Sequence, residues 1–148
     1  MIKILCVGRL KEKWLLQASA EYLTRLSKYC RLEVAEIKEH SDRNPRVSKS
    51  KEAAELIGRI GDKSKYQTIA LDVSGKQMTS EEFSNLLKNQ NLLFIVGGPE
   101  GLDEKILSKS DLTLSLSKMT FTHQIARILL LEQIYRGFTI QKNEKYHR

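Results

Sequence analysis

The sequence contains little cysteine and no metal-binding pattern. Its 148 residues include only two cysteines, Cys6 and Cys30. The first falls in a predicted strand and the second just beyond a predicted helix, so they form neither a CxxC pair nor a metal-ligand spacing. We therefore expect two reduced, mostly buried thiols and no metal centre.

Long apolar segments and phosphate-binding fingerprints are also missing. No apolar run approaches the length needed to cross a membrane. Lys3 interrupts the apolar start of the chain and Gly8-Arg9 follows at once, which does not fit a secretory signal. Neither GxGxxG nor GxxxxGK followed by Ser or Thr is present. These absences predict a cytoplasmic protein that has no membrane partner.

What the chain does have is a basic excess. Lys and Arg number 25 against 18 Asp and Glu, which gives a formal net charge of +7 at pH 7. Such an excess favours polyanionic partners through phosphate contacts and long-range steering. Many small proteins are basic for solubility alone. The charge by itself therefore makes a nucleic-acid partner and the absence of one equally plausible.

Strand-like and helix-like segments alternate along the whole chain. Apolar runs predict strands, and helical spacing predicts helices between them. The predicted strands are 1–7, 32–37, 68–72, 92–96 and 112–116, and the predicted helices are 11–29, 50–60, 79–88, 102–109 and 123–137. Without a composition break or an internal repeat, this pattern predicts one α/β domain, residues 1–148, with a mostly parallel sheet flanked by helices.

Some segments carry a more specific expectation. The alternating strand 32–37 is expected near a sheet edge, and the continuously apolar strand 92–96 is expected to be covered on both faces. Residues 38–50 lack any period and contain Asn44-Pro45, which predicts a flexible loop. Thr79 with Glu82 has the form of a helix capping box. The first two helices are expected to carry apolar faces formed by Trp14, Leu15, Ala18, Tyr22, Leu26 and Tyr29, and by Ala53, Ala54, Ile57 and Ile60.

The last predicted helix is apolar on nearly every side. A helix of this kind is buried all round, and a terminal element of a small domain is hardly covered by its own chain alone. Homodimer formation is the economical explanation, and a crowded monomer core is the alternative. The residues concerned are Ile125, Ala126, Ile128, Leu129, Leu130, Leu131, Ile134 and Tyr135.

Two loops in the last third of the chain follow strands that we expect to be neighbours. Such strand-end loops are where open α/β sheets bind small ligands. In the first loop, residues 97–101, glycines would let the backbone approach a ligand, although a glycine turn that leads into a helix explains the loop equally well. The second loop, residues 116–121, alternates apolar and small polar residues and could hold a flat heterocycle such as adenine. Within this loop, Lys118 is expected to be a solvated charge rather than a catalytic amine.

The three histidines carry different expectations. His40 falls in the predicted loop and is expected to be inert, and His123 is expected to meet solvent or cap its helix. His147 stands between Tyr146 and Arg148, residue types that provide stacking and phosphate contacts to RNA. A C-terminal tripeptide is otherwise most often disordered.

Taken in order, these segments resemble the RlmH family of SPOUT-superfamily methyltransferases, which act on large-subunit ribosomal RNA. Val7-Gly8, Glu21-Tyr22-Leu23, Leu71-Asp72 and Gly75-Lys76 also fall in the family's order, so the resemblance covers the whole chain. The motifs that carry it are GGPEG at 97–101, LSLSKMTF at 114–121 followed by His123, EQIYR at 132–136 and the closing Tyr146-His147-Arg148.

The resemblance implies a deep trefoil knot in the C-terminal half, a homodimer, and S-adenosyl-L-methionine bound in the knot. The implied reaction is methylation at N3 of pseudouridine 1915 in 23S ribosomal RNA, on the assembled ribosome. The implied cofactor-binding residues are Leu71, Gly97, Leu116, Ser117, Lys118, Met119, Thr120 and Phe121.

The resemblance also suggests which residues face the RNA. His147 is then the candidate proton acceptor, Tyr146 a stacking or hydrogen-bonding group, and Arg148 a phosphate or base clamp. Basic residues such as Arg9, Lys11 and Lys13 would join the tail to form an RNA surface across the dimer.

Two other functions stay open at this point. A non-enzymatic basic RNA-binding module explains the charge but leaves the two strand-end loops without a purpose. A small-molecule enzyme on a nucleotide-binding α/β fold explains the loops but neither the basic excess nor the tail.

Overall fold

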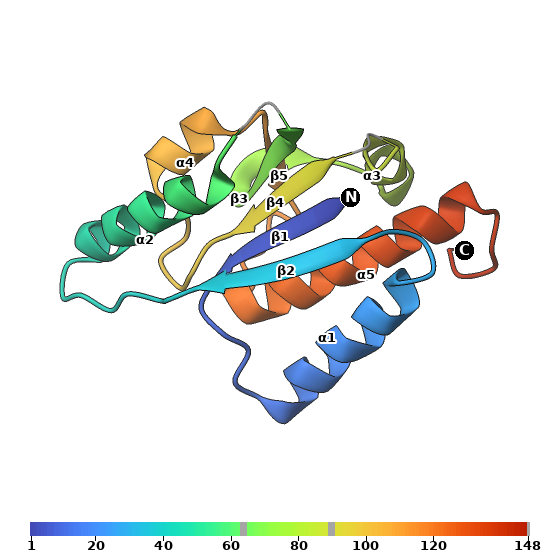
Figure 1. The fold of residues 1–148 in the computed structure, drawn as a ribbon, viewed down its shortest axis with the longest axis horizontal. Helices are drawn as coiled ribbons and strands as arrows, with labels where there is room; N and C mark the ends of the chain where they lie inside the picture. Colours follow the sequence, from blue (N-terminus) through green and yellow to red (C-terminus); the bar gives the residue numbers. More distant parts are fainter. Residues whose placement is uncertain (63–64, 89–90, 148) are drawn as a thin grey trace.

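The computed structural model describes residues 1–62, 65–88 and 91–147. Five strands form one parallel sheet that has helices on both faces (Figure 1). The predicted α/β architecture is confirmed. The strands are β1 (Ile2–Val7), β2 (Leu32–Ile37), β3 (Gln67–Gln77), β4 (Leu92–Val96) and β5 (Leu112–Ser115), and the helices are α1 (Lys13–Leu26), α2 (Pro45–Ile60), α3 (Ser80–Leu86), α4 (Glu104–Lys109) and α5 (His123–Gln141).

The strands lie across the sheet in the order β2-β1-β4-β3-β5. This order confirms that β2 is an edge strand and that β4, buried at all five residues, is an interior one. The expectation that β4 and β5 are neighbours is wrong, because β3 lies between them. Crossover connections allow a parallel strand to insert away from its predecessor, so chain order does not give spatial order.

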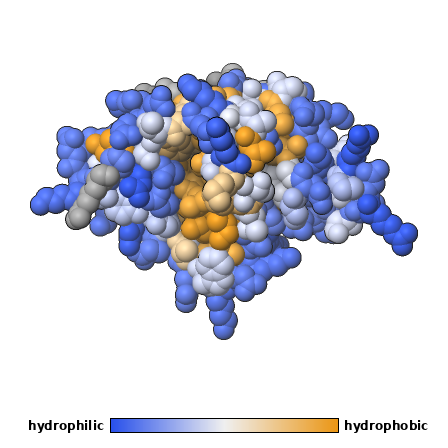
Figure 2. All heavy atoms as spheres, turned by 180° about the vertical axis from the view of Figure 1, so that it is seen from behind, coloured by the Kyte–Doolittle hydropathy of each residue, from blue (hydrophilic) through white to orange (hydrophobic). Residues whose placement is uncertain are grey.

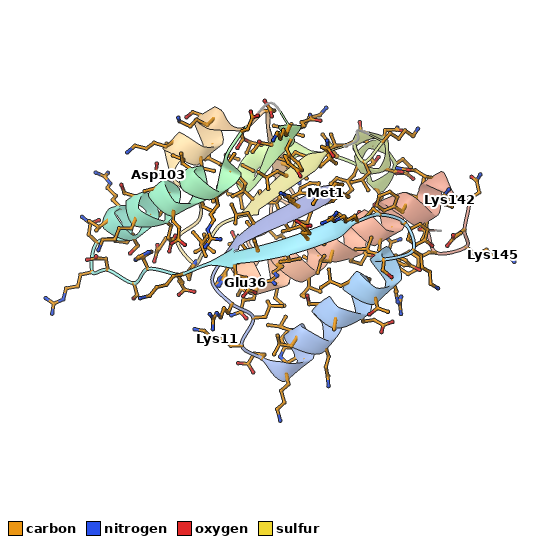
Figure 3. The ribbon with its side chains drawn as sticks, in the orientation of Figure 1. Met1, Lys11, Glu36, Asp103, Lys142 and Lys145 are labelled. Atoms are coloured by element: carbon orange, nitrogen blue, oxygen red, sulfur yellow. The ribbon has the colours of Figure 1, made fainter. Side chains whose placement is uncertain are left out.

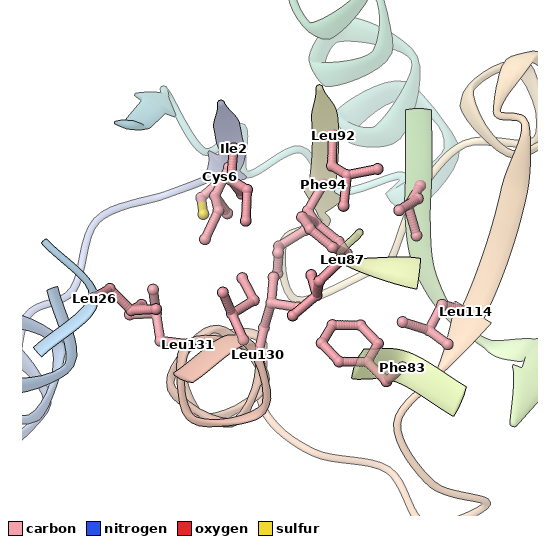
Figure 4. Packing of buried hydrophobic residues seen from close by; sticks show 14 residues of the cluster. Ile2, Cys6, Leu26, Phe83, Leu87, Leu92, Phe94, Leu114, Leu130 and Leu131 are labelled. Carbon is pink, nitrogen blue, oxygen red and sulfur yellow. The ribbon is translucent and has the colours of Figure 1, made fainter. Parts of the chain in front are cut away.

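Each face of the sheet carries its own apolar core. Helices α1, α3 and α5 cover one face, and α2 and α4 cover the other. Figure 4 shows Leu130 and Leu131 of α5 directed at the strands, between Leu26 of α1 and Phe83 of α3. Both α5 leucines are completely buried, and each such side chain contributes roughly 1.5–3 kcal/mol to folding.

The single chain covers only part of α5. Ile134 is fully buried like the two leucines, whereas Ile125, Ile128 and Leu129 are half-buried. The helix also runs past its predicted end to Gln141.

Two expectations for α1 have different outcomes. Leu15 and Leu26 of its apolar face are buried, as the spacing predicts. Trp14 is 56% exposed, so its placement on that face is wrong. The reason is that Trp14 lies in the first turn of the helix and faces an open pocket rather than the sheet.

Helix α2 begins at Pro45, five residues before the predicted start. Asn44 caps it by accepting the N–H of Arg46, and proline at the first position gives up no intrahelical hydrogen bond. The Asn-Pro pair is therefore a helix start rather than part of a flexible loop.

The apolar face predicted for α2 is only partly correct. Ala53 is buried, whereas Ala54 and Ile57 are exposed. Polar Ser48 and Glu52 take their place because each accepts a backbone N–H from residues 38–44. Asp42 donates to Ser48 Oγ at 2.8 Å and His40 donates to Glu52 Oε1 at 2.9 Å.

Short-range capping follows the sequence closely. Thr79 and Glu82 form the predicted capping box at α3, with both reciprocal hydrogen bonds present. Both cysteines are free, as predicted, and burial raises the pKa of the Cys6 thiol to about 12. In the described parts of the chain, no helix is long and apolar enough for a membrane span, and no cluster of His, Cys, Asp and Glu is arranged to hold a metal ion.

Candidate functional site

A pocket of about 920 Å³ opens at the carboxyl-terminal edge of the sheet. Its walls come from the ends of β3, β4 and β5, the loops after β4 and β5, the first turn of α5 and the start of α1. This edge is where ligands bind in open α/β sheets. The volume lies within the range of small-molecule sites.

The loop after β4, residues 97–101, is a tight turn. Gly101 donates its N–H to the carbonyl of Gly98 at 3.0 Å, and its φ of +77° lies in the region that favours glycine. Asp103 then caps α4 by accepting the N–H of Lys105. The loop is therefore held in shape by its own backbone and by the helix that follows.

A buried carboxylate lies behind this loop. Glu52 of α2 is only 4% exposed, and its Oε2 lies 3.5 Å from where a Cβ on Gly98 would stand. Burial raises the pKa of Glu52, and the hydrogen bond from the His40 N–H partly offsets that effect. Glu52 thus ties α2 to residue 40 and lies close behind Gly98.

The loop after β5 is shaped by serine side chains. Buried Ser115 donates its hydroxyl to the carbonyl of Ser117 at 2.9 Å, and Ser117 Oγ accepts the N–H of Met119 at 3.0 Å. Thr122 then caps α5 by accepting the N–H of Ile125. These local bonds hold the loop between β5 and α5 beside the pocket.

Strand β3 reaches the pocket through a bulge. Its pairing with β5 shifts register between Leu71 and Lys76, and Asp72 and Val73 line the pocket within that irregular segment. Gly75 is needed there, because a Cβ would lie 2.6 Å from the backbone of Thr113. The close approach of β3 to β5 therefore depends on the missing side chain.

The structure brings most of the predicted cofactor residues together. Lys118 is exposed and does not line the pocket, because the turn from Ser117 to Met119 carries it outside. The predicted residues that do line the pocket are Leu71, Gly97, Leu116, Ser117, Met119, Thr120 and Phe121.

His123 lies in the pocket wall with 16% of its side chain exposed, and the expectation that it caps its helix is wrong. Thr122 is the cap, and the imidazole is mostly buried, with Nε2 3.7 Å from Glu39 Oε2. Burial lowers the pKa of His123 and the Glu39 carboxylate partly opposes this shift. Its Nε2 is buried and makes no hydrogen bond within the described structure.

The C-terminal tail folds back on α5. Tyr146 donates its hydroxyl to Glu132 at 3.1 Å, and its ring packs edge-on against Tyr135 at 4.7 Å between centroids. His147 Nε2 lies 2.9 Å from Glu81 of α3. Arg148, the third predicted tail residue, lies outside the described residues.

The tail does not enter the pocket of its own chain. Neither Tyr146 nor His147 lines it. The tail contacts α5 at Glu132, six residues past Ala126 in the pocket wall, which is roughly 9 Å along the helix axis. Figure 1 shows the C-terminus beside the end of α5 that is remote from the carboxyl-terminal edge of the sheet.

Comparison with known proteins identifies the fold and the chemistry. A family model described as "Predicted SPOUT methyltransferase" matches residues 1–147. The chain belongs to the SPOUT methyltransferase family. The resemblance drawn from its motifs is confirmed, and the protein is a methyltransferase.

Curated relatives of this SPOUT chain extend over its full length. Proteins named "Ribosomal RNA large subunit methyltransferase H" include one from Caldicellulosiruptor saccharolyticus, 42% identical over 156 residues and covering 100% of both chains. Another, from Clostridium kluyveri, is 44% identical over 159 residues and covers 99% of each. A solved structure described as a probable methylase family protein from Haemophilus influenzae has a TM-score of 0.61 at 15% identity, covers 99% of this chain and 70% of that one, and supports the fold alone.

Sequence reasoning missed several residues at this SPOUT pocket. A glutamate in a helix is usually predicted to face solvent, so the local sequence gives no sign that Glu52 is buried. Trp14 was assigned to a helix face, although its place directly after Lys11-Glu12-Lys13 is a signal for an exposed aromatic among charges. Asp72 was assigned to a strand and lines the pocket because that strand bulges.

Proposed function

We propose that this methyltransferase transfers a methyl group from S-adenosyl-L-methionine to N3 of pseudouridine 1915 in 23S ribosomal RNA, on the assembled ribosome in the cytoplasm. The observation that carries the proposal is the pocket at the carboxyl-terminal edge of the sheet, which the loops after β4 and β5 build together. The names of the full-length relatives support the choice of substrate.

The pocket's side chains suit this methyl donor. Leu71, Val96 and Leu114 offer apolar surface for adenine, and Asp72 and Glu100 offer carboxylates for the ribose hydroxyls and the cationic end. The donor carries no phosphate, which agrees with the absence of a phosphate fingerprint. Leu116–Phe121, apart from Lys118, would enclose it from the β5 side.

The chain's own task is mostly one of positioning. The bound donor supplies a sulfonium-activated methyl group. The protein must then hold base N3 in line with that methyl group and accept the N3 proton. We assign acceptance of the N3 proton to His147. Tyr146 would stack on the RNA or hydrogen-bond to it, and Arg148 would contact a phosphate or a base. Burial raises the pKa of Tyr146, which keeps its phenol neutral and able to donate.

A homodimer would unite the tail with a pocket. Ile125, Ile128 and Leu129 of α5 remain half-buried in the single chain. Figure 2 shows apolar side chains gathered in a band across the middle of one face, with hydrophilic surface on either side. Surface of this kind is typical of an interface. We propose that two copies pack there, so that the tail of one reaches the pocket of the other, and that the C-terminal half forms the trefoil knot.

The RNA surface would lie beside the pocket. Arg9 and Lys11 are exposed between β1 and α1, and Lys13 is exposed as the first residue of α1. Figure 3 labels Lys11. The backbone N–H of Lys11 donates to Gln124 of α5 at 3.1 Å, which anchors the basic segment to the pocket wall. Lys142 and Lys145, also labelled in Figure 3, lie past the other end of α5.

The test is methyl transfer from labelled donor to free ribosomal RNA and to assembled ribosomes, with mass spectrometry to map the product. A methyl group on N3 of the named pseudouridine is expected, and a different nucleotide or no transfer would refute the proposal. Calorimetry with the donor separates the rival RNA-binding module, which should release no heat.

A further inference from the structure

Exposed apolar side chains concentrate at the pocket. Among the residues that the structure describes, seven large hydrophobic side chains are exposed, and four of them line this pocket. Large exposed apolar patches mark binding surfaces, whereas scattered exposed residues need no explanation. The four residues are Trp14, Val73, Met119 and Phe121.

Trp14 stands apart from the other three because it comes from α1, whereas Val73 comes from β3 and Met119 and Phe121 come from the loop after β5. It is the only tryptophan of the chain. The neighbouring Leu15 is 3% exposed in the core, and the N–H of Lys11 is bonded to Gln124. The backbone around Trp14 is therefore anchored on both sides while more than half of its side chain is left uncovered.

The pocket offers more room than one ligand subsite requires. Its volume of about 920 Å³ lies near the upper end of the usual range for small-molecule sites. The strand-end side contains the residues assigned to the methyl donor. The α1 side adds Glu12, Trp14 and Leu15, none of which that assignment uses.

The segment that leads into Trp14 is mostly basic, with Glu12 as its one acidic residue. Arg9, Lys11 and Lys13 are exposed in the five residues before Trp14. An aromatic ring beside basic side chains is the arrangement by which proteins stack an unpaired RNA base while they neutralise the adjacent phosphates. A second copy of the chain would gain less from this surface, because three like charges would be brought into the contact.

We propose that Trp14 is a stacking platform for an unpaired base of the RNA substrate, on the side of the pocket opposite the methyl-donor subsite. This inference rests on the proposed function and adds a residue that contacts the substrate. It predicts that Trp14 contributes to RNA binding and not to donor binding.

The experiment compares Trp14→Leu, Trp14→Phe and wild type in methyl transfer to purified large ribosomal subunits. Loss of one base–aromatic stack raises the KM for subunits roughly tenfold in Trp14→Leu, and Trp14→Phe recovers most of it. Calorimetric affinity for S-adenosylhomocysteine stays within twofold of wild type. Leu16→Ala is the matched control, because Leu16 is 50% exposed on the same helix but does not line the pocket.

Different results would refute the role of Trp14 and the proposed methyl transfer. Failure of the wild-type protein to methylate any RNA would refute the proposed function. If the wild-type protein is active, an unchanged KM for subunits in Trp14→Leu would overturn the stacking role of Trp14. A loss of donor affinity in Trp14→Leu, with the KM for subunits unchanged, would overturn it as well. Because Trp14 is the sole tryptophan, emission of the RNA-free protein also reports on it directly. A blue-shifted spectrum protected from acrylamide would show that a second copy covers the ring and would overturn the platform as well.

Discussion

The guanidinium of Arg127 in α5 lies 2.6 Å from the carboxylate of Glu36 in β2, although the two residues are 91 positions apart. Arg127 is 7% exposed, and its Nε is buried without a hydrogen-bond partner. The ion pair fastens the edge strand to the helix whose first turn lines the pocket. Burying the Arg127 cation costs solvation, whereas Glu36 keeps 30% of its side-chain exposure, so the main effect is expected when the carboxylate is removed and the cation stays.

Glu36→Gln should destabilise the protein by about 2–4 kcal/mol, because it leaves the buried Arg127 guanidinium without its carboxylate. Urea unfolding measures the change. In a double-mutant cycle with Arg127→Met, Glu36→Gln should cost much less once Arg127 is gone. Simple additivity of the two effects would show that the pair is not coupled.

Gly75→Ala and Gly58→Ala should change the stability of the protein in opposite directions. A Cβ at Gly75 would lie 2.6–2.7 Å from the backbone of Thr113 and Leu114, so β3 and β5 must separate and the pocket between them must distort. A Cβ at Gly58, in α2, meets nothing within 4 Å, and alanine there should stabilise the helix by about 0.5–1 kcal/mol. Thermal unfolding and donor calorimetry test both. Equal behaviour of the two variants would contradict the role given to Gly75.

Glu52→Gln should raise the melting temperature at neutral pH and leave it unchanged in acid. Burial raises the pKa of Glu52 above its ordinary value of 4.5, so the folded state favours the protonated carboxyl. The contribution of the protonated Glu52 carboxyl to folding stability is fully present below pH 4.5 and is lost as the pH rises through the raised pKa. Glutamine removes the buried charge and still accepts the His40 N–H. Melting curves from pH 4 to pH 8 measure the difference, with Glu55→Gln on the same helix as control. A constant difference across that range would refute this account.

His147→Ala should lower kcat by roughly a hundredfold or more if the imidazole accepts the N3 proton. Donor affinity should not change, because the role proposed for His147 is to accept the proton of the RNA base and not to bind the donor. A His147→Ala protein with wild-type kcat would remove it from the mechanism.

Mixed dimers test whether tail and pocket come from different copies. A tail variant, His147→Ala, is mixed with a pocket variant, Leu116→Trp, each inactive alone. Random pairing makes half of the dimers mixed, and each mixed dimer regains one intact site, so roughly a quarter of wild-type activity should return. No recovery would place the tail and the pocket in the same copy.

Local patterns predicted much of this fold. Apolar runs and helical spacing located the five strands and five helices of the described residues, and the Thr79–Glu82 pair located a cap, because those signals depend on neighbours within one or two turns. The glycine loop, the 114–121 segment and the tail were enough to recognise the family. The flexible loop predicted at Asn44-Pro45 is wrong, because an Asn-Pro pair begins helices as well as loops.

Other features were decided only when distant segments met. The place of β3 between β4 and β5, the burial of Glu52 behind residues 97–101 and the exposure of Trp14 at the pocket mouth are invisible to periodicity. The sequence by itself determined which segments are helix or strand and which loops carry the family's motifs, since hydrogen-bond geometry and spacing are local. Only the tertiary structure decided which side chains those loops enclose, because burial depends on contacts between residues far apart in the chain.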